Sequence, residues 1–165
     1  QLYRTPGRRE QTLEDASFDA WIKFYRPDEN SPNATISYYL KGALVALALD
    51  LEIRLKTDSA RSLDDVVRAL WREYGAPGSP GLPEGGFERL AEEVTGVDLE
   101  AFFRQALRTT VDPPLGILLA QFGVRTHFRA AESAGDAGGR RGTREDRPRP
   151  WLGAKVRGDG VRLRV

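Results

Sequence analysis

The sequence predicts a mainly α-helical fold that ends in a short β segment. Three observations predict it. Residues 36–55 form a long, almost continuously apolar stretch. Segments on both sides of it repeat apolar residues at helical spacing between helix start and stop signals. After Gly123 the pattern changes to loose alternation, and a glycine turn follows near the end of the chain.

Residues 1–11 are polar and form an entry loop, and the first helix is expected over roughly 12–24. Thr12 with Asp15 resembles a capping box at its start. Its apolar residues at helical spacing are Phe18, Trp21, Ile22 and Phe24. Residues 25–33 are too rich in Pro, Asn and Asp for regular structure. They form a loop that should lie beside the start of the next helix.

Residues 36–55 are expected to form a central, buried helix. Its leucines make one broad stripe when placed at 100° per residue: Leu40, Leu44, Leu47, Leu51 and Leu55. On the opposite side of the helix, the residues around Tyr39 are small: Gly42, Ala43 and Ala46. Small side chains let a second helix or a ligand come close to the backbone of this helix. Lys41 either extends to solvent or pairs with Glu52, three turns further on. Charged residues interrupt the stretch before it reaches the roughly 18 apolar residues of a membrane span.

Four shorter helices should follow. Capping residues, prolines and glycines give their expected limits: Ser62 to Gly75, Phe87 to Gly96, Asp98 to Leu107, and Asp112-Pro113-Pro114 to Gly123. In the first of these, the inward residues are predicted to be Leu63, Val66, Val67, Leu70 and Trp71.

The C-terminal part divides into three segments. Residues 124–130 favour a short exit strand, which closes a domain over 1–131. Residues 132–150 lack large apolar side chains and form a flexible Gly/Arg/Pro linker. Residues 151–165 carry two short strand patterns around Gly158-Asp159-Gly160, which predict a hairpin that begins an incomplete β domain.

Composition excludes several kinds of site. The chain has one histidine, His127, and no cysteine, so no His/Cys metal cluster can be built from it alone. Residues 1–122 carry a net charge of −5 and residues 123–165 a net charge of +6. The five arginines of residues 140–149 have no aromatic residue among them, so we expect a solvated linker and no nucleic-acid partner. His127 is expected to be structural.

Polar side chains gather at the start of the central helix. Tyr38 and Tyr39 lie in its first turn, and loop 25–33 should bring further polar groups near them. Candidate substrate-binding residues in that loop are Asp28, Glu29, Asn30 and Asn33. Two alternatives stay open: the tyrosines serve packing alone, and the loop is a solvated connector held by Asx turns.

The residues also resemble a known family. Tyr39-Leu40-Lys41-Gly42-Ala43 resembles the Tyr-x-Lys-Gly-Ala segment of the gluzincin zinc aminopeptidases. Residues 17–33 and 37–39 are closely similar to the glycyl aminopeptidase family, in which a thermolysin-like catalytic domain precedes a PDZ domain. Residues 87–103 look like the helical lobe of such enzymes, and 151–154 are similar to the start of the PDZ domain. The resemblance covers residues 7–131 well and 151–165 weakly.

The resemblance implies a role for one tyrosine. By alignment of the motif, Tyr39 would donate a hydrogen bond to the oxyanion of the tetrahedral intermediate, with Tyr38 as the alternative. The family binds zinc through a His-Glu-x-x-His helix, which this sequence lacks. We therefore expect the chain to be the C-terminal helical lobe of the catalytic domain, without metal ligands, binding no zinc alone, and inactive by itself. The parent enzyme would bind zinc and release small N-terminal residues such as Gly or Ala from peptides.

The alternative function is a non-catalytic helical interaction module with a basic tail. For either function we expect no membrane partner, and an exposed cleft surface that can drive homo-oligomerisation. The lack of cysteine fits a reducing compartment, so we favour a cytoplasmic location over a periplasmic one.

Overall fold

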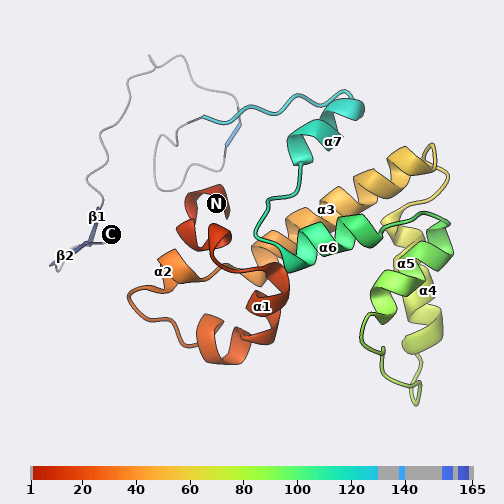
Figure 1. Ribbon diagram of the computed structural model, residues 1–165, viewed down its shortest axis with the longest axis horizontal. Helices are drawn as coiled ribbons and strands as arrows, with labels where there is room; N and C mark the ends of the chain where they lie inside the picture. The colour runs from red at the N-terminus through yellow and green to blue at the C-terminus, as the bar shows by residue number, and fades with distance from the viewer. Residues whose placement is uncertain (1, 130–137, 140–153, 158–159, 164–165) are drawn as a thin grey trace. The chain divides into compact units, whose positions relative to one another are not determined.

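The computed structural model describes residues 2–129, 138–139, 154–157 and 160–163. The described chain is mainly helical, as predicted, and divides into two compact units, residues 1–125 and 126–165 (Figure 1). The predicted domain limits at 131 and 150 stay predictions. The first unit contains two short 3-10 helices, η1 (Leu2–Arg4) and η2 (Pro6–Arg9), a π-helix, η3 (Ala20–Phe24), and the α-helices α1 (Leu13–Phe18), α2 (Ser31–Ala34), α3 (Tyr38–Lys56), α4 (Leu63–Tyr74), α5 (Gly86–Thr95), α6 (Glu100–Arg108) and α7 (Leu115–Gln121).

Helix α3 is the centre of the first unit, because each apolar core cluster contains its residues. One cluster joins Leu49 and Ile53 to Val66, Ala91, Val97, Leu99 and Phe103, which lie on or near α4, α5 and α6. A second joins Ala48 and Leu51 to Leu115 and Leu118 of α7. A third joins Val45 to Leu13 of α1 and Ala106 of α6. Burial of these side chains supplies the main drive for folding.

The buried face of α3 is not the predicted leucine stripe. Leu51 is buried, but Leu40 and Leu47 are exposed. The buried residues are instead Lys41, Val45, Ala48, Leu49, Leu51 and Ile53. The helix is apolar on all sides, so its periodicity does not select one face; the partners α1, α4, α6 and α7 do. Tyr39, Ala43 and Ala46 lie on the exposed side, and the role of this side as a cleft wall stays a prediction.

The predicted first helix is divided into two. Thr12 caps α1 by accepting a hydrogen bond from the Asp15 amide at 3.0 Å, which confirms the start signal. The chain then changes at Asp19 to the wider π-helical turn of η3. Phe18, Trp21 and Ile22, which were expected to pack at helical spacing, are exposed. Leu13, Ala16 and Ala20 are buried in their place. Loop 25–33 also contains the single helical turn of α2.

The limits of the later helices follow local signals closely. Ser62 and Asp65 form the predicted capping box, and α4 ends at Gly75. Helix α5 ends at Gly96, whose φ of 68° suits glycine. Asp98 accepts a hydrogen bond from the Glu100 amide at 3.1 Å, so its carboxylate does serve the first turn of α6. The predicted inward faces are less accurate, because Val67 and Trp71 of α4 are exposed.

The second unit is described only in part. Residues 124–129, which run from the end of the first unit into the second, are irregular, so the predicted exit strand is wrong over these residues. A short segment becomes a strand only when another strand pairs with it. Strands β1 (Ala154–Arg157) and β2 (Gly160–Leu163) pair antiparallel, with Ala154 opposite Leu163. Their pairing agrees with the predicted hairpin, whereas its turn at 158–159, residues 151–153 and most of the predicted linker lie outside the described residues.

The stretch from α2 to α3 is long and apolar enough to cross a membrane, judged by length and composition. These properties are weak evidence for a membrane span, because the core helix of a soluble protein has them too. The described chain breaks the stretch at residues 35–37, and the core clusters join α3 to other helices of its own unit.

Candidate functional site

Three tyrosine hydroxyls meet where η3 approaches the start of α3. Ser37 caps α3 by accepting a hydrogen bond from the Leu40 amide at 3.3 Å, so Tyr38 and Tyr39 occupy the first helical turn. Tyr25 follows directly after η3. Its hydroxyl lies 3.1 Å from the hydroxyl of Tyr38 and 3.2 Å from that of Tyr39. Loop 25–33 therefore begins beside the two tyrosines, as predicted.

Ring contacts hold this tyrosine cluster together. The Phe24 ring packs edge-on against Tyr25 and Tyr38, with both centroid distances at 5.3 Å. The Tyr38 and Tyr39 rings lie 4.2 Å apart, and Trp21 packs 5.1 Å from Tyr25. Contacts of this kind contribute about 0.5–1.5 kcal/mol each beyond area burial. They place three hydroxyls at one point of the surface.

The hydrogen bonds of the tyrosine cluster shift the pKa values of Tyr38 and Tyr39 in opposite directions. The pKa of Tyr38 is raised, chiefly by its hydrogen bond with Tyr25 and then by Tyr39. The pKa of Tyr39 is lowered, chiefly by its hydrogen bond with Tyr25 and then by Tyr38. The causes of both pKa shifts are the neighbouring tyrosines and burial. Tyr39 is also the more open of the two, with 60% of its surface exposed, whereas Tyr38 is half-buried.

The N-terminal segment fixes the entry to α3. Gln11 is buried, and its Oε1 accepts a hydrogen bond from the Ile36 amide at 3.1 Å. Gly7 lies against the backbone of Thr35 so closely that an added Cβ would stand 2.3 Å from the Thr35 carbonyl oxygen. These two contacts hold the residues directly before Tyr38 in place.

A second polar cluster lies on the opposite, buried face of α3. Lys41 has 0% of its surface exposed, so the prediction that its side chain extends to solvent is wrong. Its Nζ donates a hydrogen bond to the Thr109 carbonyl at 3.5 Å. Glu52 pairs with Lys56 instead, at 3.2 Å. Arg8 forms an ion pair with Asp112, whose Oδ1 is buried without a hydrogen-bond partner in the described part of the chain. Burial lowers the pKa of Lys41, while Asp112 acts to raise it and Arg8 to lower it.

The predicted substrate-binding residues make local contacts. Asp28 accepts a hydrogen bond from the Ser31 hydroxyl at 2.8 Å, and Asn33 donates to Asn30 Oδ1 at 3.2 Å. Asp28, Glu29 and Asn30 are exposed, and Asn33 is half-buried. The hydrogen bond from Ser31 is the main reason that the pKa of Asp28 is lowered. These bonds shape the turn that leads into α2, which is the alternative role that the sequence left open.

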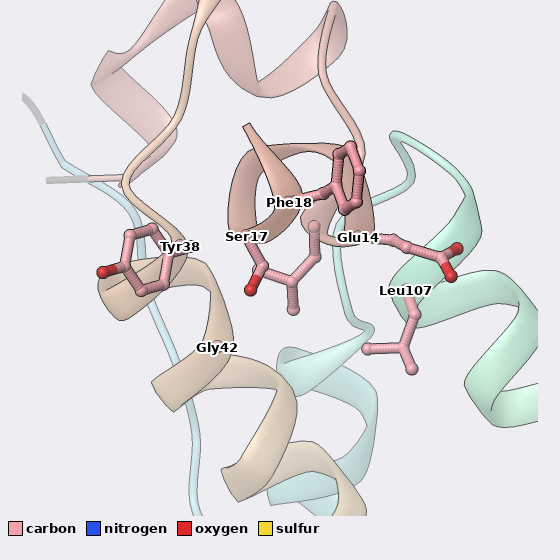
Figure 2. A pocket seen from close by; sticks show the side chains of 7 residues that line it. Glu14, Ser17, Phe18, Tyr38, Gly42 and Leu107 are labelled. Carbon is pink, nitrogen blue, oxygen red and sulfur yellow. The ribbon is translucent and has the colours of Figure 1, made fainter. Parts of the chain in front are cut away.

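A groove lies beside the tyrosine cluster, between α1 and α3 (Figure 2). Its volume is about 490 Å³. The side chains that line it are Leu13, Glu14, Ser17, Phe18, Tyr38 and Leu107, together with Gly42. The Tyr38 hydroxyl points away from the other labelled side chains of the groove. No heavy atom lies within 4 Å of where a Cβ on Gly42 would stand, so the groove is open at this point.

The described residues do not fit a zinc ion. They contain no group of three or more His, Cys, Asp or Glu side chains that could hold a metal. The chain's single histidine, His127, is exposed in the irregular segment 124–129 and belongs to the second unit. Tyr38, Tyr39 and Lys41 lie in the first unit, and neither a phenol nor a buried ammonium is a usual zinc ligand.

Comparison with known proteins supports the family over a short stretch. The family model described as M61 glycyl aminopeptidase matches residues 1–45. This is a family of metallopeptidases. The matched stretch ends inside α3 and includes the whole tyrosine cluster and Lys41. No curated protein and no solved structure matches the chain.

Sequence reasoning missed three members of these clusters. The spacing of Trp21 and Tyr25 was a usable signal for Tyr25, since residues four apart share one side of a helix. Nothing in the sequence marked Arg8 and Asp112 as partners, because 104 residues separate them.

Proposed function

We propose that this chain forms part of a glycyl aminopeptidase, an enzyme that releases small residues such as Gly or Ala from the N-terminus of peptides. The observation that carries the proposal is the family match over residues 1–45, which contains Tyr38, Tyr39, Lys41 and Gly42 in one stretch. In this proposal the metal ligands and the general base lie outside this sequence. The chain contributes the wall of the active-site cleft formed by the start of α3.

Tyr39 is the hydrogen-bond donor in this proposal. When water adds to the carbonyl carbon of the N-terminal peptide bond, the carbonyl oxygen becomes an oxyanion. The C–N bond then breaks, the new amine takes up a proton, and the carbonyl reforms. A phenol stays protonated at neutral pH, because its ordinary pKa is about 10. It can therefore donate to the charge that develops on the oxygen, and such a donor contributes roughly 2.7–4 kcal/mol to the transition state.

Exposure supports Tyr39 over Tyr38 as this donor. Tyr39 is 60% exposed on the face of α3 that carries Ala43 and Ala46. Small side chains there leave room for a peptide near the hydroxyl. Asp28, Glu29, Asn30 and Asn33 remain candidates for contact with the substrate's α-amino group, because they belong to the loop that begins at Tyr25.

The test is the turnover of glycyl and alanyl substrates by the complete peptidase. Tyr39→Phe removes one hydroxyl and should lower kcat by about 10²–10³, with KM nearly unchanged. Tyr38→Phe should have a much smaller effect. Tyr74→Phe, at the end of α4, is the matched control and should leave both constants unchanged. Wild-type turnover in Tyr39→Phe would reject the assignment.

A further inference from the structure

The hydroxyl of Tyr25 is shared between two neighbours. A phenol carries one proton to donate and can accept through its oxygen lone pairs. Tyr25 therefore cannot donate to both Tyr38 and Tyr39. Three arrangements satisfy both contacts: Tyr25 donates to Tyr39 and accepts from Tyr38, it does the reverse, or it accepts from both. Only the first of these leaves the proton of Tyr39 available to a substrate.

We propose that Tyr25 is a positioning residue that selects Tyr39 as the donor, through a hydroxyl chain that runs from Tyr38 to Tyr25 to Tyr39. The inference rests on the proposed function for its catalytic consequence. The chain of hydroxyls itself rests on the contacts of 3.1 Å and 3.2 Å between the three oxygens. Tyr25 need not touch the substrate in this arrangement.

Two further observations support this direction of the chain. The pKa of Tyr39 is lowered and that of Tyr38 is raised, chiefly by their hydrogen bonds with Tyr25 in each case. These opposite shifts are expected if Tyr39 receives a hydrogen bond, since a donated bond stabilises its ionised form. The exposed position of Tyr39 then presents its own proton to the cleft, while the half-buried Tyr38 uses its proton on Tyr25.

The first measurement needs no catalysis. The chain has five tyrosines, so their ring signals can be followed by nuclear magnetic resonance as the pH is raised, and assigned with single Tyr→Phe variants. Tyr25→Phe keeps the ring that packs on Phe24 and Trp21 and removes only the hydroxyl. In this variant, the titration of Tyr39 should move to higher pH and that of Tyr38 to lower pH. Tyr74→Phe is the control and should move neither.

The second measurement is the activity of the complete peptidase with the same variants. Tyr25→Phe should lower kcat by about two- to tenfold, the effect of one neutral hydrogen bond, with KM unchanged. The alkaline limb of its kcat profile should move to higher pH, because that limb follows the ionisation of the donor. A residue with a purely structural role would not move this limb.

The outcomes separate the two proposals. Unchanged titration of Tyr38 and Tyr39 in Tyr25→Phe would overturn the hydroxyl chain, whatever the activity shows. Shifted titrations with wild-type kcat in Tyr25→Phe would overturn the catalytic role of Tyr25. Shifted titrations with wild-type turnover in Tyr39→Phe would support the hydroxyl chain and reject the proposed function.

Discussion

Two faces of α3 differ in how far their side chains are exposed, and the buried face includes a lysine. On one face Lys41 and Leu49 are 0% and 2% exposed, and on the other Tyr39 and Leu47 are 60% and 42% exposed. Single exposed leucines are common on protein surfaces, but a fully buried lysine is not. Burial of an ammonium group opposes folding unless partners compensate.

The difference shows that the helices packed on α3, and not its own apolar periodicity, select the face that it buries. Turning α3 by half a turn would expose Lys41 to water and bury Leu47. The observed orientation instead presents Tyr39, Ala43 and Ala46 on the open face, beside Tyr25. On our account the buried face holds the helix in place, and the exposed face carries the function.

The largest expected effect on stability compares two leucines of α3. Leu49→Ala removes a side chain from the main core cluster, so it should lower the free energy of unfolding by about 2–5 kcal/mol. Leu47→Ala is the matched control on the exposed face and should change it by no more than about 0.5 kcal/mol. Chemical denaturation of both variants measures this. Equal losses would show that both faces are packed.

The next largest effect on stability tests Asp112, the acidic neighbour of the buried Lys41. Asp112→Asn removes the charge that faces Arg8 and Lys41, so the free energy of unfolding should fall by about 1.5–3 kcal/mol. Asp64→Asn is the control, because its pair with Arg68 at 3.9 Å is exposed and should contribute less than about 1 kcal/mol. If the two variants lose the same stability, the buried cluster does not stabilise the fold.

The smallest expected effect is a dependence of the free energy of unfolding on pH, caused by Lys41. The pKa of Lys41 is lowered in the folded state, because burial disfavours the charged ammonium. Between the lowered pKa and the ordinary value the unfolded chain binds more protons, and the free energy of unfolding therefore rises with pH. Lys41→Met should lack this rise. The difference in the free energy of unfolding between Lys41→Met and wild type should then change steadily at alkaline pH, which chemical denaturation at a series of pH values measures. A constant difference would contradict this expectation.

The sequence predicted best what is decided locally. The cap at Thr12, the capping box at Ser62 and the stops at Gly75 and Gly96 each depend on a few neighbouring residues, and the structure confirms them. The buried face of α3 was predicted wrongly, since a helix that is apolar on every side gives no directional signal. The exit strand at 124–129 was also wrong, because a strand depends on a pairing partner that the local pattern does not reveal.

The candidate site could be predicted only in part for the same reason. Tyr38 and Tyr39 stand out by their place at the helix start. The meeting of their hydroxyls with Tyr25 depends on the π-helical turn of η3, and periodicity predicted an ordinary helix there. The buried cluster around Lys41 includes Arg8 and Asp112, which come from opposite ends of the first unit.

The most direct test of the central claim is the binding of a tetrahedral transition-state analogue to the complete peptidase. An interaction made only in the transition state should affect the analogue and not a ground-state ligand. Tyr39→Phe should therefore weaken the analogue by about 10²–10³ and leave the affinity for a non-hydrolysed substrate analogue within about twofold. Equal weakening of both ligands, or of neither, would contradict the claim that Tyr39 acts as the donor to the oxyanion.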